Sequence, residues 1–160
     1  MRGTQSWTDP SHASVLAPGK RPRLTPSPAL ALGPKGPKGR ELLPFGTPGG
    51  DVQIQAMLQA FLNMTEFGMN PQQAIEAPRF ATYSFPDSFQ PHDYRPDLLM
   101  LESRFPDDYA DNLSARGHDA KWWPQFIWRA GAVCAVRKNA DSGLMLAGAD
   151  PRRTAYALGI

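Results

Sequence analysis

The spacing of apolar residues becomes regular after residue 50. Between residues 51 and 67, apolar side chains recur every three or four positions, which is the spacing of one face of an α-helix. The residues on that face are Ile54, Met57, Leu58, Phe61, Leu62 and Thr65. Gly68 follows them, and glycine readily adopts the left-handed conformation that ends many helices. The pattern therefore predicts an amphipathic helix over 51–67.

A second, shorter helix is predicted directly after the first. Asn70 is a favourable N-cap, Pro71 suits the first helical position, and Gln73 can return a hydrogen bond to the cap. Pro78 cannot continue a helix, because proline lacks the backbone N–H and clashes with the preceding turn. The segment "QQAIEA" is thus expected to form one short helix.

The remainder of the chain consists of short strand-like segments and one more helix. That helix is predicted from Pro106 to Gly117, with the acids Asp107, Asp108 and Asp111 on a solvated face. The strand candidates are 28–32, 41–45, 79–85, 97–103, 120–128, 131–139 and 144–149. Helices packed on largely antiparallel strands indicate an α+β fold.

Composition divides the chain near residue 50. Residues 1–50 hold nine of the 17 prolines and eight of the 14 glycines, and residues 1–40 hold seven Lys or Arg against one acid. Alone, such a segment would be called disordered. Within a larger protein, it could equally lie as an extended strap over a site. We treat 1–160 as one unit, with a Pro/Gly-rich strap over 1–50 and helices and antiparallel strands over 51–160.

The residue types exclude several kinds of site. Cys134 is the only cysteine, so an internal disulfide framework and a zinc knuckle are excluded. Its place within a strand predicts a buried structural thiol. His12, His92 and His118 have no metal-ligand spacing, and no apolar run is long enough to span a bilayer. We expect no cofactor, no metal and no membrane partner.

The stretch "FGTPGGD" carries the strongest chemical signal. Gly49 and Gly50 lie between a strand and a helix, where glycines can simply provide the turn. Alternatively, two N–H groups without a neighbouring Cβ, at the start of a helix, can stabilise an oxyanion. A phosphate loop is disfavoured, because no Gly-Lys-Ser/Thr follows. From the spacing alone, both the structural and the chemical interpretation stay open.

Five stretches together resemble a known family. They are "DPSHASVLAPGKRPRLTPSPALAL", "FGTPGGDVQIQAMLQAFLN", "FGMNPQQAIEAPRF", the "LE…RGH" region and "GADPRRTAYALG". In this order they are similar to the C-terminal part of the small subunit of gamma-glutamyltransferase, or glutathione hydrolase, and above all to its acylase-like members. The resemblance covers nearly the whole chain.

The resemblance implies an N-terminal nucleophile hydrolase fold, in which two sheets lie between helix layers, and which this chain would form only in part. In that family the precursor cuts itself and exposes a threonine, whose hydroxyl attacks a γ-glutamyl amide while its own α-amine acts as the base. Gly49 and Gly50 match the glycines of the oxyanion hole, and Thr25 matches a hydroxyl that binds the substrate's α-carboxylate.

Three departures from the family pattern limit this interpretation. Leu24 replaces the first of two carboxylate-binding serines, and Met1 replaces an asparagine in "MRGTQSWTDP", where Asp9 comes a few residues too late to match the acid that binds the substrate amine. The acyl group cleaved is therefore open: it is γ-glutamyl or a related acyl amide. The threonine nucleophile is absent from the sequence. We expect a fragment that is inactive alone and that partners the large subunit and the missing part of the small subunit.

A different function class also fits part of the sequence. Residues 1–40 could form a basic flexible arm that binds an acidic partner such as nucleic acid, which would make the chain a non-catalytic α+β module. Trp7 is the only Phe, Tyr or Trp in residues 1–40, so base stacking is poorly supported and we expect no nucleic acid partner. The tryptophans Trp122, Trp123 and Trp128 are expected in the core or at a subunit interface. Asp150 and Arg152 are expected to pin the last turn.

Overall fold

The computed structural model describes residues 2–33 and 40–159; the proline-, glycine- and lysine-containing segment 34–39, expected not to form a helix, lies outside this part. The strands are β1 (Ala29–Leu32), β2 (Glu41–Gly46), β3 (Phe80–Thr82), β4 (Leu98–Glu102), β5 (Asp119–Trp123), β6 (Cys134–Asn139) and β7 (Met145–Ala149). The helices are α1 (Val52–Thr65), α2 (Pro71–Glu76) and α3 (Asp108–Ser114), with short 3-10 turns η1 (Arg2–Gln5) and η2 (Trp128–Ala130). Every predicted helix forms, and each strand candidate overlaps an observed strand, so the α+β class is confirmed.

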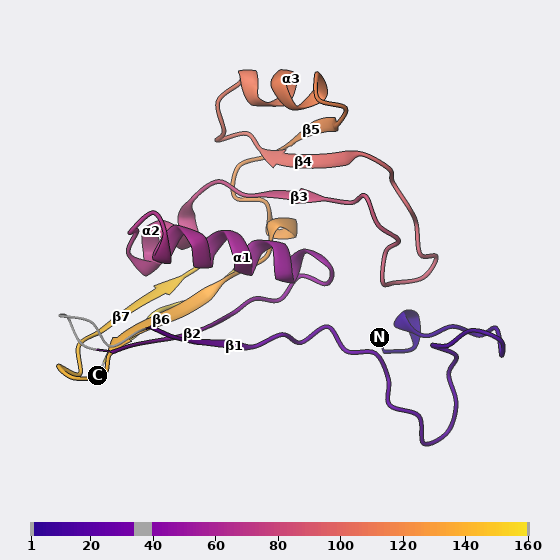
Figure 1. Cartoon of the computed structure of the whole chain (residues 1–160), viewed down its shortest axis with the longest axis horizontal. Helices are drawn as coiled ribbons and strands as arrows, with labels where there is room; N and C mark the ends of the chain where they lie inside the picture. The colour runs from indigo at the N-terminus through magenta and orange to yellow at the C-terminus, as the bar shows by residue number, and fades with distance from the viewer. Residues whose placement is uncertain (1, 34–39, 160) are drawn as a thin grey trace.

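The larger sheet has four antiparallel strands in the order β1-β2-β6-β7. Helices α1 and α2 lie against one of its faces (Figure 1). Leu43 of β2 and Ala135 of β6 point toward the helices and are buried, as is Ile75 of α2. This contact between helix and sheet forms the main core of the chain.

The opposite face of this sheet is largely exposed, although the tail residues Tyr156, Ala157 and Leu158 line a cavity together with residues of this face. Leu30 and Leu32 of β1 are 64% and 62% exposed, and Pro44 and Cys134 are exposed on the same side. The prediction that Cys134 is buried is therefore wrong. Successive residues of a strand point to opposite faces, so the burial of Ala135 against the helices directs Cys134 to the open face.

The smaller sheet has the order β3-β4-β5. Strands β3 and β4 are antiparallel, and β4 and β5 form the one parallel pair among the named strands of the described residues, so the expectation of largely antiparallel strands holds. A parallel pair needs a crossover connection, and α3 provides it. Figure 1 shows α1 between the two sheets. Trp123 is buried, as expected of a core residue, whereas Trp122 and Trp128 are exposed.

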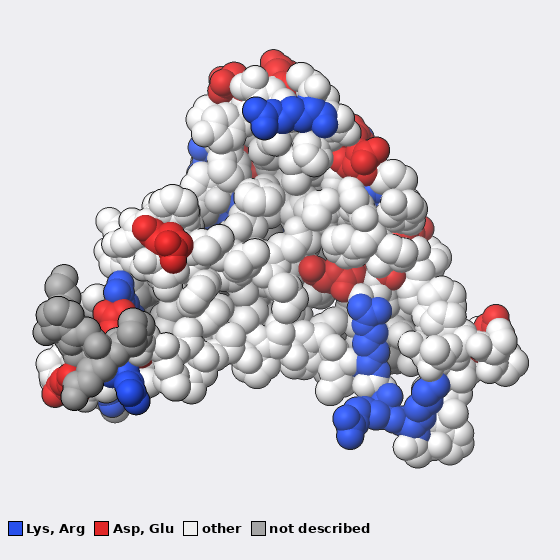
Figure 2. Space-filling view, in the orientation of Figure 1, with Lys and Arg blue, Asp and Glu red and all other residues white. Residues whose placement is uncertain are grey.

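Helix α1 has two apolar faces. The face buried in this chain consists of Val52, Gln53, Ala56, Met57, Ala60 and Met64. Three residues of the predicted stripe, Ile54, Leu58 and Leu62, lie on the other face and remain exposed. The middle of this side of the molecule is nearly free of charged side chains in Figure 2.

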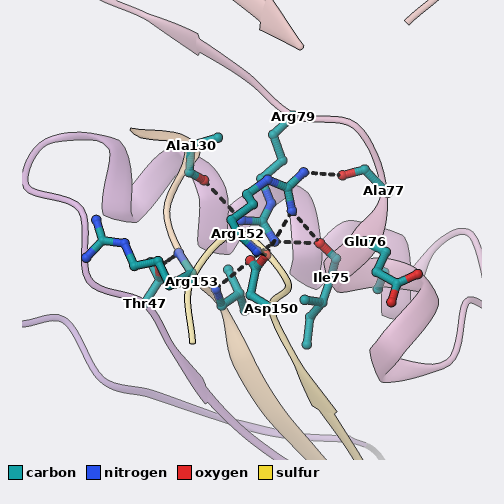
Figure 3. Close-up of polar contacts among 12 residues, drawn as sticks. Thr47, Ile75, Glu76, Ala77, Arg79, Ala130, Asp150, Arg152 and Arg153 are labelled. Carbon is teal, nitrogen blue, oxygen red and sulfur yellow. Dashed lines mark hydrogen bonds and ion pairs between the residues drawn. The ribbon is translucent and has the colours of Figure 1, made fainter. Parts of the chain in front are cut away.

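A buried ion network joins the end of the chain to the smaller sheet. Arg152 donates from Nε to Glu102 on β4 (2.8 Å) and from Nη1 to Asp150 (3.1 Å), and Arg79 pairs with Asp150 (2.7 Å). The two arginines also donate to the carbonyls of Ile75, Ala77 and Ala130 (Figure 3). The prediction that Asp150 and Arg152 pin the last turn is confirmed.

The network shifts the pKa of its members. Burial lowers the pKa of Arg79 to about 10, and the nearby positive charge of Arg152 adds to this effect. Burial by itself would raise the pKa of Glu102, but the hydrogen bond and charge of Arg152, with the Arg79 N–H and Arg104, hold it below its usual value. Glu102 is therefore ionised in the folded protein down to lower pH than a free carboxyl group.

Candidate functional site

The turn from β2 into α1 is built around two glycines. Gly49 has φ +143° and Gly50 has φ +60°, and a side chain is disfavoured in both conformations. Their carbonyls accept the first helical hydrogen bonds, from Val52 and Gln53, each at 3.2 Å. The Thr47 hydroxyl donates to the Pro48 carbonyl (2.7 Å) and accepts from the Ala132 N–H (2.6 Å). The turn is thus fixed both to the helix and to the residues that enter β6.

Asp51 joins this turn to the long connection between β3 and β4. Although it occupies the N-cap position of α1, it makes no capping hydrogen bond. Its carboxylate accepts instead from the backbone N–H of Ser88 (2.7 Å) and from the Ser88 hydroxyl. Phe89, the next residue, lies so close to Gly50 that a Cβ there would meet its ring at 3.0 Å. The β3–β4 connection therefore packs directly on the glycine turn.

Gln53 connects the glycine turn to the strap. Its side chain is almost fully buried. The amide oxygen and nitrogen both find hydrogen-bond partners when the nitrogen faces the strap and the oxygen faces the glycine turn. The two hydrogens of Nε2 then point to the carbonyls of Thr25 (2.9 Å) and Thr47 (3.1 Å), with the Ser27 hydroxyl also within 3.2 Å of this nitrogen, while Oε1 accepts from the Gly50 N–H (3.2 Å). Among the described residues, the Gly49 N–H has no acceptor.

Thr25 and Gly50 line the same cavity, of about 270 Å³. Thr25 is half-buried, and within the described chain its hydroxyl makes no hydrogen bond, so it is available to a ligand. Arg23, Leu24 and Phe85 contribute to the same wall. The structure therefore brings Thr25 and Gly50 together, although 25 residues separate them in the sequence.

A second cavity opens beside the first. Gly49, Gly50 and Asp51 line it from the turn, and its other walls come from Val52, Tyr83, Asp87, Phe89, Trp128, Arg129 and Arg153. Burial raises the pKa of Tyr83, while the positive charge of Arg129 acts in the opposite direction. The phenol is therefore neutral at physiological pH. Gly50 and Asp51 are common to both cavities, so the glycine turn lies where the two meet.

The other candidate residues lie away from these cavities. Trp7 is stacked between His12 and His92, at 3.9 Å and 4.1 Å between ring centroids. No group of three His, Cys, Asp or Glu in the described chain is arranged to hold a metal ion. None of the helices described is both long and apolar enough to cross a membrane.

The basic residues of the strap lie mainly at the surface. Lys20, Arg21 and Arg23 are exposed, and Figure 2 shows blue side chains gathered on the N-terminal segment. Lys20 donates to the Ala13 carbonyl (2.6 Å), and Arg23 lines the Thr25 cavity. Part of the basic charge therefore belongs to the candidate site, while binding of an acidic partner stays a prediction.

Sequence reasoning missed Gln53 and the cluster of Trp128, Arg129 and Arg153. A glutamine in the first turn of a helix normally faces solvent, and its position three residues after Gly50 was the only hint of its role. Nothing in the spacing of residues 128–153 indicates that η2 and the segment after β7 converge on the glycine turn, because tertiary structure alone brings them together.

Comparison with known proteins identifies the family. The gamma-glutamyltranspeptidase family model matches residues 2–160. The chain belongs to this family. The resemblance of its motifs to gamma-glutamyltransferase is thereby confirmed.

The relatives include enzymes named for different substrates. The chain is 31% identical over 160 residues to a glutathione hydrolase-like proenzyme of Bacillus subtilis, covering 99% of this chain and 28% of that protein. It is 30% identical over 158 residues to an oxamate amidohydrolase proenzyme of Klebsiella pneumoniae, covering 99% and 28%. The chain thus spans less than a third of the length of these family members.

Solved structures agree on the fold. Cephalosporin acylase from Bacillus halodurans superposes with a TM-score of 0.69 at 27% identity, over 94% of this chain and 25% of that one. The fold of the chain is therefore that of part of a gamma-glutamyltranspeptidase-type N-terminal nucleophile hydrolase. The helix layer α1–α2 on the four-stranded sheet belongs to that fold.

Proposed function

We propose that this chain forms the oxyanion hole and part of the substrate pocket of an amidohydrolase that cleaves γ-glutamyl or related acyl amides. The N–H groups of Gly49 and Gly50 donate to the oxyanion, and the Thr25 hydroxyl binds a carboxylate of the acyl group. The chain is the C-terminal portion of the small subunit, and the attacking threonine belongs to a preceding segment. One observation carries this proposal: Thr25 and Gly50 line one cavity and are joined through Gln53.

In the proposed reaction, the threonine hydroxyl attacks the carbonyl carbon of the amide. An O–C bond forms, the carbonyl oxygen becomes the oxyanion, and the hydroxyl proton passes to the threonine α-amine. The oxyanion then collapses, the C–N bond breaks, and the proton moves to the leaving nitrogen. Water attacks the resulting ester in the same way, which releases the acid and regenerates the threonine.

The Gly50 N–H already has a hydrogen-bond partner, so it can serve the oxyanion only if it leaves or shares that partner. The N–H faces Gln53 Oε1, at 3.2 Å, which is at the long end of the range for N–H···O hydrogen bonds. A charged oxyanion is a much stronger acceptor than a neutral amide oxygen. The Gly50 N–H is therefore expected to turn to, or be shared with, the oxyanion when it forms, while Gly49 donates directly.

The first test is the activity of the chain with and without the rest of a precursor. The isolated 160-residue chain is expected to show no hydrolysis of γ-glutamyl 4-nitroanilide, because it holds no candidate nucleophile. A precursor in which the chain follows a threonine-led segment and a large subunit is expected to hydrolyse this or another acyl anilide. Turnover by the isolated chain above a heat-treated control would contradict the proposed division of the site.

The second test removes the donor N–H groups one at a time. Proline is a poor choice, because its fixed negative φ would also distort a turn that needs positive φ. Replacement of Gly49 or Gly50 by glycolic acid, through semisynthesis of the assembled enzyme, exchanges only the N–H for an ester oxygen. Each change is expected to lower kcat by about 10²–10³. The same exchange at Gly19, an exposed glycine with open space around it, is the control, and normal turnover in both variants would refute the oxyanion assignment.

The proposed partners are supported by two largely exposed apolar faces. One is the open side of the four-stranded sheet, with Leu30, Leu32 and Cys134, and the other is the stripe Ile54–Leu58–Leu62 on α1. Large exposed apolar patches commonly mark contact surfaces. We assign them to the large subunit and to the preceding part of the small subunit.

A further inference from the structure

Two arginines stack on one tryptophan beside the glycine turn. The Arg129 guanidinium lies 5.6 Å from the Trp128 ring centroid, and that of Arg153 lies 5.4 Å from the same ring. Arg153 also donates to the Trp128 carbonyl, at 3.4 Å. All three residues line the cavity that contains Gly49 and Gly50. Two positive charges are thereby held next to the proposed oxyanion site.

Neither arginine has a carboxylate partner in the described part of the chain. Arg153 is adjacent to Arg152, which is fully engaged in the buried ion network, but its own side chain points away from that network (Figure 3). The Arg153 Nε–H is buried and has no acceptor within the described residues. An unused, buried donor of this kind is costly unless a ligand or another chain satisfies it.

The acids in the same cavity are already hydrogen-bonded to other groups. Asp51 accepts from the backbone N–H and the hydroxyl of Ser88, and Asp87 accepts from the Phe89 N–H (2.8 Å). No ion pair joins either acid to Arg129 or Arg153 among the described residues. The two guanidinium groups can therefore bind an incoming anion without first breaking an internal salt bridge.

The position of the arginines assigns that anion to one end of the substrate. If Thr25 binds the acyl group in the first cavity, the carbonyl carbon lies near Gly50, which lines both cavities, and next to Gly49, which lines the second. The leaving nitrogen then extends into the second cavity, toward Arg129 and Arg153. We infer that Arg129 and Arg153 bind a carboxylate carried by the leaving amine, and that these two residues discriminate between leaving amines with and without such a group. This inference rests on the proposed function.

Arginine suits this task for two physical reasons. Its planar guanidinium can donate two parallel hydrogen bonds to one carboxylate. Stacking on Trp128 restricts both side chains before the ligand arrives, so less conformational entropy is lost on binding. Trp128 thus acts as a platform that positions the two guanidinium groups.

A pair of chromogenic substrates tests the inference. The assembled enzyme is assayed with the 4-nitroanilide of the acyl group that it hydrolyses fastest, and with the same anilide carrying a 3-carboxyl group on the leaving ring. Arg129→Gln and Arg153→Gln are each expected to lower kcat/KM for the carboxylated anilide about tenfold, mainly through KM, which corresponds to about 1.4 kcal/mol. The plain anilide is expected to lose less activity in both variants, so the readout is the ratio of the two kcat/KM values, in which any general effect of the lost charge on the nearby oxyanion cancels.

Controls separate binding of the carboxylate from folding of the enzyme. Arg116→Gln removes an exposed arginine outside the cavity. This variant is expected to leave kcat/KM unchanged for both anilides. Arg153→Lys keeps the charge and should recover part of the discrimination if Arg153→Gln weakens folding. Equal effects of the Arg129 and Arg153 variants on both anilides, or no effect on either, would overturn the inference alone. An unmodified enzyme that hydrolyses neither anilide would overturn the proposed function, and the inference with it.

Discussion

At the scale of single residues, Gln53 has the most connections in the candidate site. Its one amide group contacts the strap at Thr25 and Ser27, the end of β2 at Thr47, and the glycine turn at Gly50. Such a buried amide is favourable only when each of its donors and acceptors has a partner. Gln53 therefore fixes the distance between Thr25 in the strap and the proposed oxyanion donor at Gly50.

Replacing Gln53 by leucine is expected to destabilise the chain by about 1–3 kcal/mol, because Thr25 and Thr47 lose a donor and the Gly50 N–H loses its acceptor in a buried place. Urea unfolding followed by tryptophan fluorescence measures the change. Gln125→Leu, at an exposed position, is the matched control and is expected to stay within about 0.5 kcal/mol. Equal stability of the two variants would mean that the Gln53 contacts contribute nothing.

At the scale of elements, α2 illustrates how a local sequence signal becomes structure. The Asn70 side chain accepts from the Gln73 N–H (2.9 Å), and the Gln73 side chain accepts from the Asn70 N–H (3.1 Å). Pro71 occupies the first helical position. The helix has only six residues, so it depends more on this cap than a long helix would.

Asn70→Ala removes one half of this capping box and is expected to cost about 1 kcal/mol. Thermal unfolding followed by circular dichroism would detect the loss. Asn112→Ala, at an exposed position inside α3, is the comparison, because alanine is the better helix former there. A capping variant no less stable than the Asn112 variant would show that packing against β7 alone maintains α2.

The elements also show what the sequence could and could not predict. Capping residues such as Asn70, and glycines such as Gly68 (φ +66°), act through their immediate neighbours, so their effects could be predicted correctly. The exposure of Leu58 and Cys134 depends on which of two apolar faces the rest of the chain covers. Periodicity marks apolar positions but does not identify the covered face.

Only those residues of the candidate site that lie in recognisable sequence motifs could be predicted. Gly49, Gly50 and Thr25 were proposed from motifs, and the structure brings Thr25 and Gly50 to one cavity. Gln53 and Arg153 are ordinary polar residues in the sequence. They reach the site because α1 and the segment after β7 converge there, and this convergence is a property of the tertiary fold.

At the scale of the whole molecule, the buried ion network holds distant parts of the chain together. Arg152, near the C-terminus, binds Glu102 of the smaller sheet and the end of α2, and Asp150 accepts from the Val133 N–H (2.8 Å) just before β6. The smaller sheet, the helix layer and the larger sheet are thereby linked. Loss of one charge leaves its partners buried and unpaired.

The pKa of Glu102 makes this link sensitive to acid. Its pKa is lowered in the folded state, so its stabilising contribution is present above the ordinary value of 4.5 and is lost as the pH falls through the folded value. Glu102→Gln is expected to cost about 3 kcal/mol at neutral pH and to flatten the loss of stability below about pH 4.5. Urea midpoints from about pH 7 to about pH 3 measure both effects, with exposed Glu66→Gln as the control. If the Glu102 variant lost stability below about pH 4.5 as steeply as the unmodified chain, the role given to Glu102 in acid sensitivity would be wrong.

Cys134 provides a probe of the open sheet face. In the isolated folded chain its thiol is exposed, and it is expected to react with a thiol reagent nearly as fast as in the unfolded chain. In an assembled precursor, the partner proposed for this face should slow the reaction by at least about tenfold. Equal rates in the two forms would show that this face stays open, and slow reaction of the isolated chain would contradict its position in the sheet.

The shared amide of Gln53 has a consequence for selectivity. A substrate that fits poorly against Thr25 would disturb the same side chain that orients Gly50, and the donor would then be misaligned at the moment when charge develops. Poor substrates should therefore lose kcat in addition to the affinity that they lose at Thr25, so that discrimination is expressed in kcat as well as in KM.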